Sequence, residues 1–253
     1  MEKRTFSVKI PEVDKVEQGR EQFIVEYEGH EETILAHDYD SIYRVPGLYE
    51  YLFYENYKCS SPGVISSMLE QVVEDSSMEM SDLTVLDVGA GNGMVGEKLK
   101  DAGTGSLLGI DIIEEAAEAA ERDRPGVYKE YFVEDLIELP EDVEKKIEQA
   151  EPNCMTVVAA LGFDDMPPGA FVAGYNLITT PGWIAFNIKD QFLTDNDTSG
   201  FSRLINRITS EGLFEPRARR RYLHRYCQDF TPLHYYAIVG KKTDDIPSDW
   251  AEC

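Results

Sequence analysis

The stretch TVLDVGAGNGMVGEKL, residues 84–99, decides the fold. It opens with an apolar run, passes at once into three closely spaced glycines and continues in a helical pattern. Glycine lets the backbone turn tightly and approach a ligand closely, and the first turn of a helix offers N–H groups that lack partners. The stretch therefore predicts a buried strand, a glycine loop and a helix that together bind a small polar ligand.

Strands and helices alternate from this stretch onward. Strands are expected at residues 84–88, 106–110, 127–133, 155–160, 183–188, 219–226 and 233–239. Helices are expected at residues 63–78, 95–102, 114–123, 141–150, 168–177 and 201–212. Because parallel strands need long crossovers, the alternation predicts an α/β fold with a doubly wound, seven-stranded, mostly parallel sheet. The connection between the last two strands is too short for a crossover, so they are expected to form a reversed C-terminal hairpin.

The residues before this sheet predict a small extension. FIVEYEGHEETILA, residues 23–36, has the pattern of two strands joined by a turn at Gly29. Seven aromatic residues follow between Tyr39 and Tyr57, and they fit either a satellite core or a lid that faces a substrate. We expect a hairpin and aromatic lid over 1–62, the main domain over 63–242 and a loose C-terminal tail over 243–253.

The amino-acid composition disfavours several classes of ligand and cellular location. The chain has 253 residues, with 48 acidic and 24 basic side chains and a formal charge of −24, which opposes binding to a phosphate backbone. Its cysteines lie far apart and no cluster has metal-ligand spacing, so we expect no metal site. No signal peptide or membrane-spanning run is visible. We expect a soluble, cytoplasmic protein that binds neither nucleic acid nor membranes.

The glycine loop is compatible with two classes of cofactor-binding protein. Gly91, Gly93 and Gly96 match the G-x-G-x-x-G pattern of dinucleotide-binding proteins, and the acidic Asp111 follows at a suitable distance. Two features favour another assignment: Asp87 precedes the first glycine by two residues, and the sheet is expected to end in a reversed hairpin. A nicotinamide-dependent oxidoreductase is therefore the weaker alternative.

At these residues the sequence resembles the class I S-adenosylmethionine-dependent methyltransferases. The first motif of that family, DxGxGxG, is present as Asp87, Gly89, Gly91 and Gly93, and the order of elements agrees from about residue 63 to 241. The resemblance implies a Rossmann-like fold whose seven-stranded sheet ends in a reversed hairpin. It implies S-adenosylmethionine as the cofactor and methyl transfer as the reaction.

The resemblance also assigns cofactor contacts. The glycine loop would pass beneath the methionine part, with Asp87 holding the loop and the amino group, and Asp111 would accept hydrogen bonds from the ribose. Asp135 would face the adenine amino group, with Glu134 as the one-residue alternative. The complete expected set is Asp87, Gly89, Ala90, Gly91, Gly93, Asp111, Ile112, Asp135, Leu136 and Ala160.

The sequence gives fewer indications of the residues that contact the substrate. The [DN]PP[YF] motif of enzymes that methylate amino groups of bases is absent after the fourth strand. Residues that follow the fourth and fifth strands can reach the ligand edge of the sheet, namely Phe163, Asp164, Asn187, Lys189 and Asp190. His224 and His234 lie near the turn of the last hairpin and fit either a general base or a structural role. No catalytic residue is assigned, because alignment and desolvation alone can drive methyl transfer.

One basic cluster runs along the first strand of the hairpin. Arg219, Arg221 and Arg225 would share one face and Arg220 the other, which favours a charged edge strand over a phosphate-binding surface.

The sequence thus predicts a methyltransferase with an unidentified, small-molecule acceptor. A protein methyltransferase and a non-catalytic, S-adenosylmethionine-binding regulatory module are the alternatives. Neither the acceptor nor the oligomeric state follows from the sequence.

Overall fold

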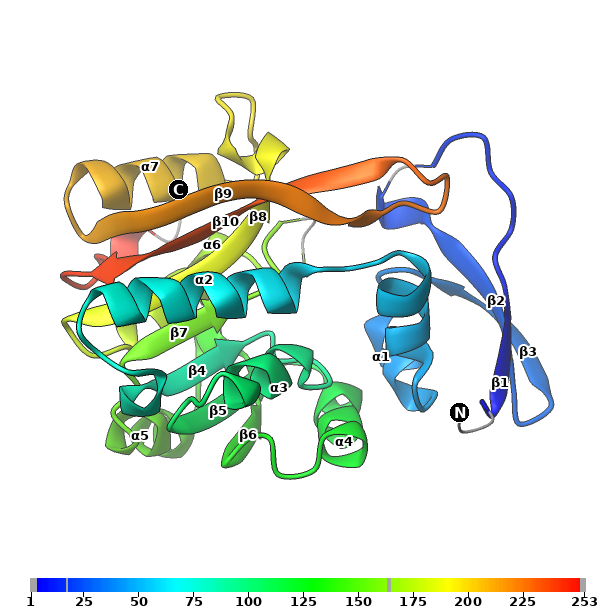
Figure 1. The fold of residues 1–253 in the computed structure, drawn as a ribbon, viewed down its shortest axis with the longest axis horizontal. Coiled ribbons are helices and arrows are strands. Elements are labelled where there is room, and N and C mark those ends of the chain that lie inside the picture. The colour runs from blue at the N-terminus through cyan, green and yellow to red at the C-terminus, as the bar shows by residue number, and fades with distance from the viewer. Residues whose placement is uncertain (1–3, 17, 163–164, 251–253) are drawn as a thin grey trace.

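The computed structural model describes residues 4–16, 18–162 and 165–250 (Figure 1). Its main sheet has seven strands in the order β6-β5-β4-β7-β8-β10-β9. Their bounds are β4 (Thr84–Val88), β5 (Ser106–Asp111), β6 (Glu130–Val133), β7 (Cys154–Val157), β8 (Gly182–Lys189), β9 (Phe214–Tyr226) and β10 (Pro232–Lys242). Strands β4 to β8 pair in parallel, whereas β10 is antiparallel to both β8 and β9. The predicted sheet and its reversed hairpin are confirmed.

Helices cover both faces of this sheet. They are α2 (Ser61–Asp75), α3 (Met94–Asp101), α4 (Glu114–Asp123), α5 (Glu141–Gln149), α6 (Pro168–Asn176) and α7 (Phe201–Ser210). Apolar residues of α2 and α3 form one core with the sheet, and those of α5, α6 and α7 form another on the opposite face. Burial of these two apolar layers is the main stabilising contribution to the fold.

Two strands are shorter than their sequence pattern suggests. The apolar run at residues 155–160 predicts a strand to its end, but β7 stops at Val157 because Ala159 adopts a φ of 59°. The Ala159 N–H donates to the Asn187 side-chain oxygen at 2.6 Å instead of to a neighbouring strand. The strand expected from Val127 starts at Glu130, because the positive φ of Gly126 places the preceding residues in a turn.

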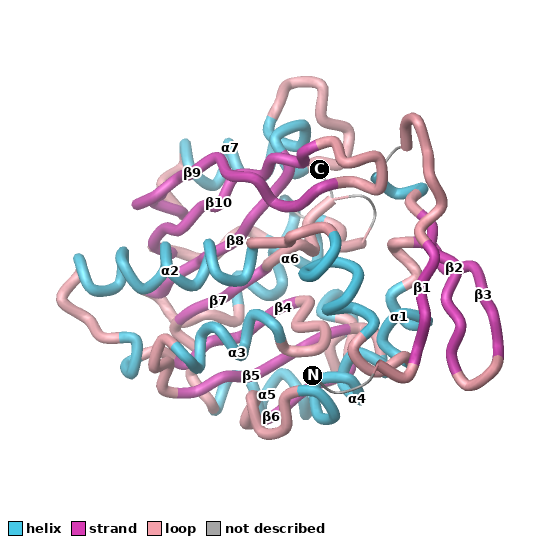
Figure 2. The backbone as a smooth tube through the Cα atoms, turned by 45° about the vertical axis from the view of Figure 1, so that its right-hand side comes forward, coloured by secondary structure: helices cyan, strands magenta, loops and turns pink. Residues whose placement is uncertain are grey.

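An N-terminal unit, formed by the described part of residues 4–57, packs beside the main domain (Figures 1 and 2). It contains β1 (Phe6–Lys9), β2 (Gln22–Tyr27), β3 (His30–Leu35), α1 (Tyr39–Arg44) and the short π-helix η2 (Glu50–Asn56). The expected hairpin is β2 and β3, and its two turn residues, Glu28 and Gly29, both have positive φ as a tight type I′ turn requires. The pairing of β1 with β2 adds a third strand that the sequence pattern does not reveal.

One ion pair and one hydrogen bond to a backbone carbonyl attach α1 to α4. The Arg44 guanidinium lies 2.8 Å from the Glu115 carboxylate, and Arg122 donates to the Tyr43 carbonyl at 3.1 Å. The N-terminal unit therefore contacts the main domain through polar side chains as well as through apolar ones.

The C-terminal segment corrects one expectation. Residues 243–250 are not a loose tail, because Ile246 and Trp250 are buried in the core beneath α6 and α7. The Ile246 N–H donates to the Asn176 side-chain oxygen at 2.8 Å, and the Arg207 guanidinium lies 3.5 Å from the centre of the Trp250 ring. These polar and apolar contacts together hold the segment against the main domain.

Candidate functional site

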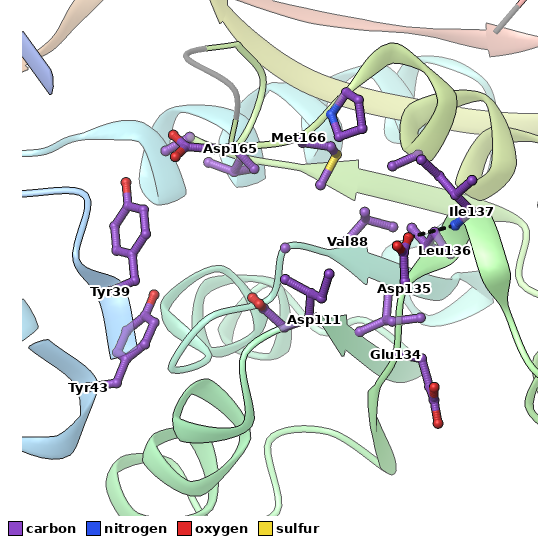
Figure 3. A pocket seen from close by; sticks show the side chains of 18 of the residues that line it. Tyr39, Tyr43, Val88, Asp111, Glu134, Asp135, Leu136, Ile137, Asp165 and Met166 are labelled. Atoms are coloured by element: carbon purple, nitrogen blue, oxygen red, sulfur yellow. Dashed lines mark hydrogen bonds between the residues drawn. The ribbon is translucent and has the colours of Figure 1, made fainter. Parts of the chain in front are cut away.

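A cavity of about 190 Å³ opens at the carboxyl edge of β4, β5, β6 and β7 (Figure 3). We call it the main cavity. The predicted residues that line it are Gly89, Asp111, Ile112, Asp135, Leu136 and Ala160. Tyr39, Tyr43 and Tyr49 close it from the side of the N-terminal unit. Ligands of open α/β sheets bind at this edge.

The glycine loop needs its glycines for two separate reasons. Gly89 and Gly91 have φ of 67° and 53°, which L side chains rarely adopt. A Cβ atom would also lie 3.0 Å from Ala160 Cβ at Gly89 and 2.5 Å from the Tyr43 hydroxyl at Gly91. Only Gly89 of this loop lines the main cavity, whereas Ala90, Gly91 and Gly93 are buried and shape the turn into α3.

Asp111 ends β5 with its carboxylate at the main cavity. Oδ2 accepts a hydrogen bond from the Gly91 N–H at 2.9 Å, and Oδ1 accepts one from the Ile113 N–H at 3.1 Å. Burial raises the pKa of this carboxyl, while its backbone donors act in the opposite direction. Each oxygen can accept one more hydrogen bond, so a pair of vicinal hydroxyls could be held here.

Asp135 and Glu134 both line the main cavity, but their carboxylates point in different directions. The Asp135 carboxylate lies at the cavity and accepts a hydrogen bond from the Ile137 N–H at 2.8 Å, which caps the short 3-10 helix at Leu136–Glu138. The Glu134 carboxylate points away from the cavity in Figure 3. Ile112 and Ile137, both exposed, are apolar residues of the cavity lining that could flank a flat ring. Ile137 was not predicted, because a lone isoleucine after a strand carries no sequence signal.

Asp87 lies beneath the loop and does not line the main cavity. Its two oxygens accept hydrogen bonds from the Thr156 and Tyr128 hydroxyls, both at 2.6 Å. Burial raises the pKa of Asp87 to about 6, although these two hydroxyls oppose the shift. The expected contact with a cofactor amino group has no support from this position, and Asp87 instead positions the loop from below.

The raised pKa of Asp87 predicts a pH dependence of stability. The folded value of about 6 exceeds the ordinary 3.8, so protonation of Asp87 stabilises the folded state at low pH. That stabilisation is complete below the ordinary value and is lost as the pH rises through about 6. The loss amounts to about 1.4 kcal/mol between about pH 5 and about pH 8.

The Asp87→Asn variant should lack this contribution. Denaturant unfolding of both proteins across the same pH range measures it as a difference that changes with pH. If the difference in free energy of unfolding between the two proteins did not change with pH, the raised pKa of Asp87 would be contradicted.

The residues predicted to contact the substrate lie in different parts of the structure. Phe163 and Asp164 lie outside the described residues. Asn187 is buried and structural: its amide donates to the Ser61 hydroxyl at 3.0 Å and to the Tyr222 hydroxyl at 2.6 Å. Neither Lys189 nor Asp190 is among the described residues that line the main cavity, and Asp190 pairs with Arg221 at 3.3 Å.

The two histidines also differ. His224 is buried, and its Nδ1 lies 2.6 Å from the Ser61 hydroxyl. Burial, together with Arg225 and Lys189, lowers the pKa of His224 well below its ordinary value, so the ring is neutral at neutral pH. His234 is half-buried and is not one of the described residues that line the main cavity.

The basic cluster is a charged edge strand with one exception. β9 is the edge of the sheet, where Arg217 and Arg221 pair with exposed acids. Arg225 is only 4% exposed and forms a bidentate ion pair with the fully buried Glu21 of the N-terminal unit. Sequence reasoning missed this pair because its members are 204 residues apart.

The aromatic segment is divided between the main cavity and the core of the N-terminal unit. Tyr39, Tyr43 and Tyr49 line the main cavity, whereas Phe53 and Tyr57 belong to the core of the N-terminal unit. Tyr51 and Tyr54 pack against the same core. Within the described residues, no group of three or more His, Cys, Asp or Glu side chains is arranged to hold a metal ion. No helix in the described part of the chain is long and apolar enough to cross a membrane.

No family model and no curated protein matches the sequence. Solved structures resemble the chain in fold. A candidate RNA methyltransferase from Pyrococcus horikoshii is 13% identical, with a TM-score of 0.52 over 74% of this chain and 87% of that one. Magnesium protoporphyrin IX methyltransferase from Synechocystis PCC 6803, with bound S-adenosylhomocysteine, is 16% identical, with a TM-score of 0.50 over 72% of this chain and 83% of that one.

A candidate hemolysin from Lactococcus lactis is 12% identical, with a TM-score of 0.51 over 74% of this chain and 90% of that one. Proteins with such different descriptions share this architecture, so the likeness concerns the fold and leaves the acceptor undefined. The order of strands, the reversed hairpin and these neighbours agree on one conclusion. The chain has the Rossmann-like fold of the class I S-adenosylmethionine-dependent methyltransferases.

Proposed function

We propose that the protein binds S-adenosylmethionine and transfers its methyl group to a small-molecule acceptor. The observation that carries the proposal is the lining of the main cavity. Asp135, Asp111 and Gly89 follow one another along the ends of β6, β5 and β4, in the order in which adenine, ribose and methionine would be needed. Ligands bind across such an edge in open α/β sheets.

The residues present fit this cofactor. Asp111 would accept hydrogen bonds from both ribose hydroxyls, since each of its oxygens has one hydrogen bond from the backbone and room for another. Asp135 would accept from the adenine amino group while Ile112, Leu136 and Ile137 contact the ring. Gly89 lets the methionine part approach the backbone, because a Cβ atom there would press against Ala160. When bound, S-adenosylmethionine supplies an electrophilic methyl group on a sulfonium.

This chain's own contribution to the reaction is enclosure and alignment. Tyr39, Tyr43 and Tyr49 cover the main cavity and would exclude water from the transferring methyl group. Orientation of an acceptor beside that group supplies most of what an in-line displacement needs. A covered cavity favours a small molecule over a protein segment, and the charge of −24 disfavours nucleic acid.

Titration calorimetry tests the cofactor assignment. We expect binding of S-adenosylmethionine and S-adenosylhomocysteine and no appreciable binding of NAD, because the Asp87 motif and the reversed hairpin distinguish this fold from that of dehydrogenases. Tighter binding of NAD would overturn the proposal. Formation of S-adenosylhomocysteine in the presence of cell extract then separates an enzyme from a non-catalytic regulatory module.

A further inference from the structure

A second, smaller cavity of about 30 Å³ lies beside the main cavity. Tyr39, Tyr49, Ala159 and Asp165 belong to the walls of both. The remaining walls of this side cavity include Gln18 and Cys59 from the N-terminal segment and His224 and Tyr235 from the final hairpin. A water molecule needs about 10–15 Å³ in this measure, so the side cavity can hold a group the size of two or so water molecules.

The side cavity continues the path of the main one. The main cavity runs past the ends of β6, β5 and β4 to Ala159 after β7, and the side cavity continues from Ala159 to Tyr235 of β10 and His224 of β9. The proposed cofactor would place its methionine end, with the methyl group, at the glycine loop. The next space beyond that end is the side cavity, which is therefore the position of an acceptor.

The directions of the hydrogen bonds among the oxygen and nitrogen atoms around His224 can be worked out, and the Cys59 sulfur lies farther from Nδ1, at 3.9 Å. The Ala159 N–H donates to Asn187 Oδ1, so the Asn187 amide nitrogen must donate to Ser61 and Tyr222. Ser61 and Tyr222 are 2.6 Å apart, and one of these hydroxyls donates to the other. If Ser61 donated, the Tyr222 proton would have no acceptor among the described residues.

The consistent arrangement has Tyr222 donating to Ser61 and Ser61 donating to His224 Nδ1 at 2.6 Å. Nδ1 of the neutral ring then carries no proton, and the proton resides on Nε2. Nε2 has no hydrogen-bond partner in the described part of the chain. His224 thus offers an unused N–H donor at the side cavity, and in this tautomer Nε2 cannot act as a base.

Gln18 supplies a complementary group. It is nine-tenths buried, and its amide donates to the Tyr235 hydroxyl at 2.9 Å. Its Oε1 is buried and has no hydrogen-bond partner among the described residues. A buried acceptor without a partner destabilises the fold, and a ligand that donates a hydrogen bond to it would recover that loss.

The charged groups of the side cavity already have hydrogen-bond partners. The Arg225 guanidinium is engaged by both oxygens of Glu21. Both Asp165 oxygens lie 3.1 Å from His37 Nδ1. A carboxylate or phosphate entering here would meet no free cation of the described walls, and burial of an unpaired anion is strongly unfavourable. An ammonium has no lone pair to accept the hydrogen bond from His224 Nε2, so it would leave that donor unsatisfied. Both classes of charged ligand are therefore disfavoured.

We infer that the side cavity binds the reacting end of the methyl acceptor, and that this end is an uncharged group with both a hydrogen-bond acceptor for His224 Nε2 and a donor for Gln18 Oε1. A carboxamide has this chemistry. The identification of the ligand as a methyl acceptor rests on the proposed function. The selection of an uncharged group depends only on the residues that line the side cavity. His224 is a positioning residue in this arrangement.

Three small probes of the same shape test the selection: acetamide, acetate and acetamidinium, which are neutral, anionic and cationic. Protein with isotope-labelled histidine is titrated with each probe near neutral pH, with and without S-adenosylhomocysteine, and the ring nitrogens of His224 are followed by NMR. We expect the free protein to show the Nε2–H tautomer. Acetamide should shift Nε2 saturably, with at least about tenfold higher affinity than either ion, which is about 1.4 kcal/mol.

Several results would overturn the inference. These are an Nδ1–H tautomer, no saturable shift with acetamide, or equal affinity for one of the ions. None of these measurements needs a variant, so they stand even if substitutions impair folding. Calorimetry of S-adenosylhomocysteine on the same samples reports separately on the proposed function.

Variants refine the role of His224. Glutamine places an N–H near the position of Nε2, so His224→Gln should keep acetamide affinity within about threefold, whereas His224→Phe should lose the binding. His234→Ala is the matched control, because His234 lies on the same hairpin and is not among the described walls of either cavity. Loss of acetamide binding in His234→Ala, or its retention in His224→Phe, would contradict the assignment.

Discussion

Replacement of Asp111 by alanine is expected to weaken S-adenosylmethionine binding about 30-fold while the protein stays folded. The variant loses two charge-assisted hydrogen bonds to the ribose, each worth about 1.5–3 kcal/mol, and water recovers part of that loss. A net loss of about 2 kcal/mol gives the stated factor. The Gly91 and Ile113 N–H groups also lose their acceptor, which loosens the loop and adds to the effect.

Calorimetry with Asp111→Ala, Asp111→Asn and Glu134→Ala separates these contributions. Asparagine keeps one acceptor oxygen and should weaken binding less than alanine does. Glu134 is the matched control, because it follows the neighbouring strand but directs its carboxylate away from the main cavity. A dissociation constant for Asp111→Ala within about twofold of the wild-type value would show that the ribose does not bind here.

A larger effect, on stability, is expected from Glu21→Ala. Glu21 is fully buried and provides both oxygens of the ion pair with Arg225, whose side chain is 5% exposed. Removal of one partner leaves the other charge buried and uncompensated, which typically costs about 3–5 kcal/mol. The Gln228 N–H also loses Glu21 as its acceptor, at a distance of 2.8 Å in the wild-type protein.

Denaturant unfolding measures this effect against a surface control. Glu215 pairs with Arg217 at the exposed edge of the sheet, so Glu215→Ala should change the free energy of unfolding by less than about 1 kcal/mol. Equal losses in the two variants would mean that the buried pair contributes no more than a surface pair. Because Arg225 lines the side cavity, Glu21→Ala should also abolish its preference for an uncharged probe.

Removal of residues 1–57 is a poorer test of the lid than the sequence suggests. The deletion would take away Glu21 and leave Arg225 buried without its partner, and it would uncover apolar residues that now pack against the unit. Tyr43→Ala is the cleaner change, since the Tyr43 side chain covers Gly91 without carrying an ion pair.

Local patterns were sufficient to predict the main sheet and the position of Asp111 at its ligand edge. β4 runs directly into the loop at Gly89, and the strand that ends in Asp111 follows after the single helix α3, so their spacing reflects one local strand–helix–strand unit. The premature end of β7 was not predictable, because it depends on Asn187 accepting a hydrogen bond from Ala159, 28 residues earlier. Strand ends are decided by such tertiary contacts more than by the pattern itself.

The side cavity was even less accessible to sequence reasoning. Gln18 and Tyr235 are separated by 217 residues, and neither belongs to a motif. His224 could be identified as a candidate, but its tautomer depends on a chain of hydroxyls and an amide from three different elements. Contacts of this kind become visible only once the fold brings the two ends of the chain together.

The contacts between the N-terminal unit and the final hairpin affect the order in which the protein can fold during synthesis. Glu21, and the Tyr57 carbonyl that accepts from the Tyr226 N–H, leave the ribosome long before their partners on the final hairpin exist. A nascent chain can therefore pair the strands of the N-terminal sheet early, but it cannot complete the walls of the side cavity until β9 and β10 have emerged. The side cavity is therefore complete only after the final hairpin has been translated, and a product truncated before Arg225 would expose an unpaired Glu21 to the cell's quality control.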